Sequence, residues 1–84
     1  RKLNKDFEKK IYSSKKNVEL VLAKIYDIND EDIQKEYMSA FQGVVYLYEE
    51  LKADYERNGF NENSDVYFGN YNNAVKLFES EFEI

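Results

Sequence analysis

The residue types that carry most enzyme chemistry are scarce in this 84-residue sequence. It contains no His and no Cys. This excludes the common catalytic pairs of a nucleophile with a His base, and it excludes metal sites with imidazole or thiolate ligands. Acid–base chemistry would therefore rest on carboxylates, Tyr or Lys. Paired acids do occur, adjacent at Glu49/Glu50 and four residues apart at Glu79/Glu83, but they lie in amphipathic segments where acids normally form a solvated face. We predict that the chain is not an enzyme and uses no cofactor.

The densest group of acids, residues 27–32, has the composition of a calcium loop but not its spacing. Counted from Asp27, Asp32 stands where the loop needs Gly, and Met38 stands where it needs a bidentate Glu. We expect Asn29 or Asp30 to cap a helix instead, with the acids that follow near the positive end of the helix dipole. The sequence predicts no metal site.

Apolar residues recur at helical spacing in three segments, so we predict an all-α protein. The helices are expected over residues 3–26, 31–57 and 64–82, with Gly59 ending the second and Asn63 or Ser64 capping the third. Phe60 is expected to fold back on Tyr55. Because the connections are short, neighbouring helices should run antiparallel, which gives an up-down-up three-helix bundle and one domain over residues 1–84.

The same periodicity predicts which side chains form the core. The expected core positions, with Ser14 filling one turn of the first stripe, are Leu3, Phe7, Ile11, Val18, Leu22, Ile25, Ile33, Tyr37, Ala40, Phe41, Val44, Tyr48, Leu51, Tyr55, Tyr67, Phe68, Tyr71, Ala74, Val75, Phe78 and Phe82. Gly43 and Gly69 fall within helices, where each costs about 1 kcal/mol relative to Ala. We expect a close approach of two helices at both glycines.

Charge divides the chain into a basic and an acidic part. Residues 1–26 carry eight Lys/Arg and three Asp/Glu, a net charge of +5, whereas residues 27–84 carry four and fourteen, a net charge of −10. Five lysines are expected on the face of the first helix opposite its apolar stripe. This basic stripe consists of Lys2, Lys5, Lys9, Lys16 and Lys24.

The acidic part favours a protein–protein interaction module that binds a basic protein, such as an adaptor, inhibitor or immunity-type protein. An acidic surface steers oppositely charged partners, and exposed Tyr is favoured at recognition surfaces. Tyr12, Tyr26 and Tyr46 are expected to be exposed. The residues expected to contact the partner are Tyr46, Glu49, Glu50, Asp54, Glu56 and Glu79.

Two alternatives use other features of the chain. The basic stripe could bind nucleic acid or an anionic surface, although five lysines without Arg on a net-acidic body predict poor nucleic-acid binding. The chain could also be an oligomerising or structural fragment of a larger protein. In that case the predicted helices over residues 3–26 and 31–57 would form a hairpin that a second copy completes as a homodimer.

The sequence gives few indications of location and origin. No apolar run approaches the roughly 20 residues of a transmembrane helix, and no signal-peptide core is present. We therefore expect a cytoplasmic protein, although a chain that does not begin with Met is compatible with processing or excision. Abundant Lys, Asn, Ile, Tyr and Phe are typical of proteins from AT-rich bacterial or phage genomes.

Overall fold

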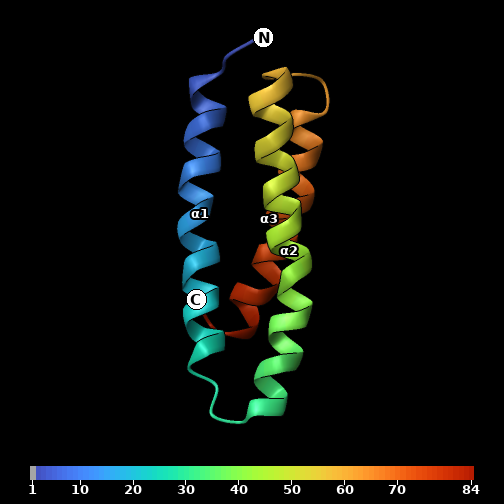
Figure 1. The fold of residues 1–84 in the computed structure, drawn as a ribbon. Coiled ribbons are helices and arrows are strands. Elements are labelled where there is room, and N and C mark those ends of the chain that lie inside the picture. Colours follow the sequence, from blue (N-terminus) through green and yellow to red (C-terminus); the bar gives the residue numbers. More distant parts are fainter. Residues whose placement is uncertain (1) are drawn as a thin grey trace.

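Three helices fold back on one another in the computed structural model, which describes residues 2–84 (Figure 1). The elements are α1 (Lys5–Tyr26), α2 (Glu31–Asn58) and α3 (Ser64–Glu81), and each helix contacts both of the others. α1 and α2 run antiparallel, and α3 runs antiparallel to α2, with its first half behind α2 and its C-terminal half visible between α1 and α2 in this view (Figure 1). The predicted all-α, up-down-up three-helix bundle is confirmed.

The bundle is a rod with extents of 46 × 19 × 15 Å. At a rise of about 1.5 Å per residue, the 28 residues of α2 span about 42 Å and set the length of the rod. The radius of gyration is 14.0 Å, compared with about 12 Å for an average domain of this length. This elongation leaves each helix with a long outer face.

The first two helices begin at side-chain caps. Asn4 Oδ1 accepts a hydrogen bond from the Phe7 N–H (3.0 Å), so α1 begins at Lys5 rather than at residue 3, and Leu3 lies outside it and is exposed. Asp30 caps α2, as predicted for this loop, because its Oδ1 accepts from the Asp32 and Ile33 N–H groups (2.9 and 3.1 Å). A cap of this kind contributes about 1 kcal/mol.

The connection between α2 and α3 turns at Gly59, which has a φ of 71° and donates its N–H to the Tyr55 carbonyl (2.8 Å). The predicted end of the second helix at this glycine is confirmed. Phe60 packs against the ring of Phe7 at a centroid distance of 5.2 Å. Asn63 occupies the cap position of α3 but makes no side-chain capping bond. Instead, Ser64 Oγ accepts from the Asn61 N–H, which closes the loop (2.9 Å).

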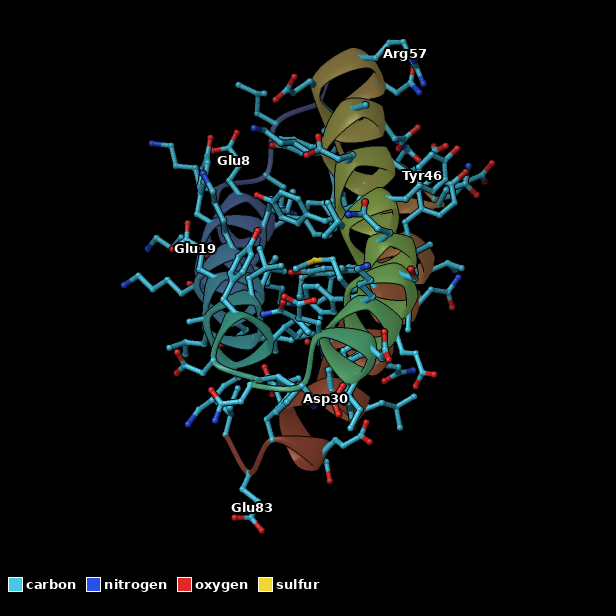
Figure 2. All side chains as sticks on the ribbon, turned by 60° about the horizontal axis from the view of Figure 1, so that its bottom comes forward. Glu8, Glu19, Asp30, Tyr46, Arg57 and Glu83 are labelled. Atoms are coloured by element: carbon cyan, nitrogen blue, oxygen red, sulfur yellow. The ribbon has the colours of Figure 1, made fainter. Side chains whose placement is uncertain are left out.

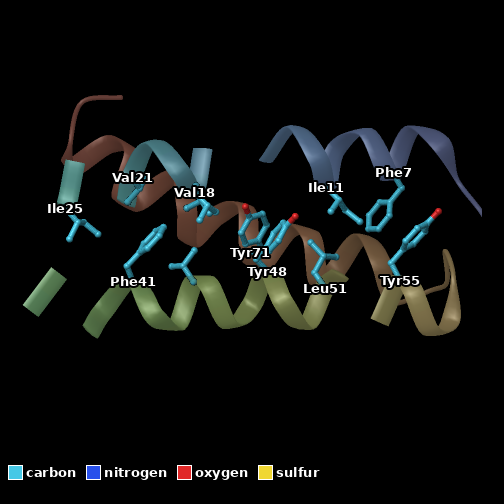
Figure 3. Packing of buried hydrophobic residues seen from close by; sticks show 12 residues of the cluster. Phe7, Ile11, Val18, Val21, Ile25, Phe41, Tyr48, Leu51, Tyr55 and Tyr71 are labelled. Atoms are coloured by element: carbon cyan, nitrogen blue, oxygen red, sulfur yellow. The ribbon is translucent and has the colours of Figure 1, made fainter. Parts of the chain in front are cut away.

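Aromatic side chains run along the core that the three helices share (Figure 3). Phe41 meets Phe78 edge-on at 4.9 Å, and Tyr48 lies 5.4 Å from Tyr71. The Tyr71 hydroxyl donates to the carbonyl of Ser14 (3.1 Å), which joins α3 to α1 inside the core. The buried apolar residues are Phe7, Ile11, Val18, Val21, Ile25, Phe41, Val44, Tyr48, Leu51, Tyr55, Tyr71 and Val75.

The core differs from the predicted stripes at their borders. Val21 is fully buried, whereas the predicted Leu22 is only half-buried. Ile33 (45% exposed), Ala40 and Tyr67 (40% exposed) face outward, so their assignment to the core is wrong. A residue at the border of a stripe is buried only if a neighbouring helix lies on that side.

The predicted close helix approach at the two glycines is also wrong. A Cβ atom added at Gly43 or Gly69 would meet no other atom within 4 Å. Neither glycine has the positive φ that would require it. Among the described residues, both positions therefore have room for the Cβ atom of an alanine.

A candidate partner-binding surface on α2 and α3

Three of the predicted contact residues share the outer face of α2. Tyr46, Glu49 and Glu50 are all exposed, and 62% of Tyr46 is accessible. Their helical spacing places them away from Phe41, Val44 and Tyr48, which point into the core. Tyr46 projects from the side of α2 that faces away from α1, whereas Glu19 lies on the opposite side of the molecule (Figure 2).

Tyr46 and Glu50 also line a hollow between α2 and α3. Its volume is about 230 Å³. We call it the tyrosine groove, because α2 and α3 each contribute one partly exposed tyrosine to it. Its lining consists of Tyr46, Leu47, Glu50, Leu51, Tyr67 and Asn70.

A short hydrogen bond fixes the polar part of this groove. The Tyr46 hydroxyl donates to Glu50 Oε1 at 2.5 Å, one helical turn away. This bond and the negative charge of Glu50 raise the pKa of Tyr46 above its ordinary value of 10.0. The hydroxyl therefore stays protonated at neutral pH and holds one carboxylate oxygen in place, while the other oxygen has no partner among residues 2–84.

A second, more open hollow lies on the same face of α2. It has a volume of about 380 Å³ and is lined by Tyr46, Glu49, Glu50, Ala53 and Arg57. Arg57 lies at the C-terminal end of α2 (Figure 2), where its charge suits the negative end of the helix dipole. Tyr46 and Glu50 thus belong to both hollows and form the centre of this surface.

The structure places the other three predicted contact residues elsewhere. Asp54 accepts hydrogen bonds from the side-chain amides of Asn58 (2.8 Å) and Asn61 (3.1 Å), so it stabilises the loop after α2. Glu56 lines a hollow between α1 and α2. Glu79 is half-buried near the far end of α3. Only Tyr46, Glu49 and Glu50 form one continuous group.

The hollow between α1 and α2 has a mixed lining. It measures about 160 Å³ and is lined by Glu8, Ile11, Tyr12, Lys52, Tyr55 and Glu56. The Tyr55 hydroxyl donates to Glu8 (2.9 Å) and accepts from the Asn4 N–H (3.0 Å). These bonds tie the N-terminal end of α1 to α2 beside this hollow.

All five lysines of the basic stripe are exposed, and four of them lie on α1. Lys2 precedes the helix, and its backbone carbonyl accepts from the Phe60 N–H (2.6 Å). Its ammonium lies 5.9 Å from the centre of the Phe60 ring, and Lys10 lies 5.8 Å from that of Phe68. Some basic groups of the N-terminal part therefore contact aromatic residues of the acidic part.

Sequence reasoning missed Tyr67 and Asn70 as part of the site. Tyr67 was assigned to the aromatic core because it shares a stripe with Tyr71 and Phe78. Its position four residues before Tyr71 gave no sign that it lies at the border of that stripe. By contrast, the predicted exposure of Tyr12, Tyr26 and Tyr46 is confirmed.

Comparisons of the chain with known protein families, curated proteins and solved structures find no significant match. Within residues 2–84, no helix has the length and apolar character needed to cross a membrane. The same residues contain no cluster of three or more His, Cys, Asp or Glu side chains arranged to hold a metal ion.

Proposed function

We propose that this protein is a non-catalytic interaction module that binds a basic protein partner through the outer face of α2 and α3. The observation that carries the proposal is the grouping of Tyr46, Glu49 and Glu50 around two hollows on one exposed helix face. Such a surface combines a rigid aromatic contact with negative charge, which favours both affinity and steering of a positive partner.

Exposed apolar residues extend this surface along α3. Val66 is 59% and Leu77 is 73% exposed. Val66 stands four residues before Asn70, and Leu77 stands seven residues after it. Helical periodicity therefore places both on the side of α3 that lines the groove. A long side of the rod, with Cα extents of 46 by 19 Å, is large enough to hold a standard interface of roughly 800 Å² per partner.

A binding role also suits the size of the hollows. The tyrosine groove, at about 230 Å³, is smaller than the roughly 300–1,000 Å³ of typical substrate or cofactor pockets. It is suited to one side chain of a partner. The larger hollow beside Arg57 is more open, so it is better described as part of a docking face.

Affinity capture with matched variants tests the proposal. The bait proteins are the wild type, the double variant Tyr46→Ala/Glu50→Lys, and the α1 control Tyr26→Ala/Glu19→Lys, which makes the same change of side chains and charge. We expect one basic protein to be retained stoichiometrically by the wild type and the control. The α2 variant should lose it, because truncating a central Tyr typically weakens binding by about 30-fold or more.

Titration calorimetry with the purified partner and light scattering of the module alone complete the test. Binding should weaken as salt increases. Recovery of nucleic acid alone, equal loss in both double variants, or no loss in the α2 variant would overturn the proposal. A homodimer that only the α2 variant disrupts would also overturn it, because the surface would then serve self-association.

A further inference from the structure

The tyrosine groove combines two aromatic rings with one carboxylate. Tyr46 comes from α2 and Tyr67 from α3, and Glu50 is the acid in the lining. Leu47 and Leu51 add apolar surface. Ring faces attract cations electrostatically, and a carboxylate accepts charge-assisted hydrogen bonds from them. The groove therefore has the chemistry of a site for a single organic cation.

The Glu50 carboxylate makes one hydrogen bond within the groove. Tyr46 donates to Glu50 Oε1, and Glu50 forms no ion pair with any of residues 2–84. The Tyr46 hydroxyl keeps its proton at neutral pH, so it donates to Glu50 and carries no charge of its own. Glu50 is exposed, so its second carboxylate oxygen is accessible to a positive group of another molecule.

Elsewhere in the chain, two lysine ammonium groups lie over aromatic rings. Lys2 lies over Phe60 and Lys10 lies over Phe68, at 5.9 and 5.8 Å from the ring centres. Within residues 2–84, no cation lies over the ring of Tyr46 or Tyr67. A cation bound in this groove would therefore come from outside the described residues.

We propose that the tyrosine groove binds an arginine side chain of the basic partner. This inference rests on the proposed function and names the group that the surface recognises. A guanidinium is flat, so it stacks on tyrosine rings while it directs two N–H groups toward a carboxylate. A lysine ammonium offers a compact point charge and stacks less well. Arginine therefore uses both the rings and Glu50.

A titration with short peptides followed by amide NMR tests this site directly. The probes are the capped tripeptide Ala-Arg-Ala and the same tripeptide with lysine or with citrulline, the neutral isostere of arginine. We expect weak, saturable binding of the arginine peptide, with shifts concentrated at Tyr46, Glu50, Tyr67 and Asn70. The citrulline peptide should bind about tenfold more weakly or not at all, because it lacks the charge.

Matched variants separate a built site from general attraction to an acidic protein. Glu50→Gln and Tyr67→Ala should each weaken the arginine peptide by about tenfold, whereas Tyr67→Phe, which keeps the ring, should bind nearly as well as the wild type. Glu19→Gln removes the same charge from an exposed position on α1 and should not change binding. Far-ultraviolet circular dichroism verifies that each variant is folded.

Several results would overturn the arginine site. They are absence of saturable binding, equal affinity for the citrulline or lysine peptide, shifts spread over α1, and an equal loss in Glu19→Gln and Glu50→Gln. Failure of the two proposals can be told apart. A partner whose binding depends on Glu49 but not on Glu50 or Tyr67 supports the surface and refutes the arginine site. Specific binding of the arginine peptide without any protein partner supports the arginine site and refutes the proposed partner-binding surface.

Discussion

Replacing Tyr71 by Phe removes one hydroxyl from the centre of the bundle and leaves the ring in place. Tyr71 is fully buried, and its hydroxyl donates to the Ser14 carbonyl at 3.1 Å. That carbonyl belongs to α1, where it also accepts a hydrogen bond from a backbone N–H of the same helix. The change therefore breaks one bond between two helices without leaving a buried polar group unpaired.

The expected cost follows from this geometry. A net contribution of about 1 kcal/mol is typical of an intramolecular hydrogen bond whose removal leaves no unsatisfied partner. This corresponds to about a fivefold shift of the unfolding equilibrium. For a domain of this size it lowers Tm by about 4–8 °C. The ring contact with Tyr48 at 5.4 Å should survive.

Tyr48→Phe is the matched control. Tyr48 is buried, but its hydroxyl makes no hydrogen bond to any other of residues 2–84. Every buried side-chain oxygen in this part of the chain has a hydrogen-bond partner. The Tyr48 hydroxyl must therefore reach the surface. Urea unfolding followed by circular dichroism should show a change within about 0.5 kcal/mol for this variant. If Tyr71→Phe is no less stable than Tyr48→Phe, the Ser14 bond does not stabilise the fold as argued.

Four further predictions concern single groups. Gly43→Ala should raise the free energy of unfolding by up to about 1 kcal/mol, because the new Cβ meets no atom within 4 Å. Asp30→Ala should lower it by about 1 kcal/mol through loss of the α2 cap; urea unfolding measures both. Glu50→Gln should lower the pKa of Tyr46 toward 10.0, and an unchanged value in a tyrosine NMR titration would contradict the hydrogen bond. The pKa of Tyr71 is raised mainly by burial. Above pH 10.0 the Tyr71 hydroxyl therefore loses its proton in the unfolded chain before it does so in the folded protein, so the free energy of unfolding should fall as pH rises. Urea unfolding between about pH 9 and pH 11 tests this.

The candidate surface was only partly predictable from the sequence. Tyr46, Glu49 and Glu50 could be placed together because neighbours on one helix are fixed by local geometry. The involvement of Tyr67 could not be predicted, because it depends on where α3 crosses α2. Asp54 was also unpredictable, since its hydrogen bond to Asn61 forms only when the loop after α2 turns back.

The amino-acid sequence by itself determined the three helices, most of their ends, and the division of charge. These properties depend on periodicity, capping and composition, which act over a few residues. Tertiary structure decided which residues at the borders of the stripes are buried, such as Val21 in place of Leu22. It also decided which exposed groups meet across two helices. The physical reason is that a helix in this bundle packs against two neighbours, and their positions set the width of its buried arc.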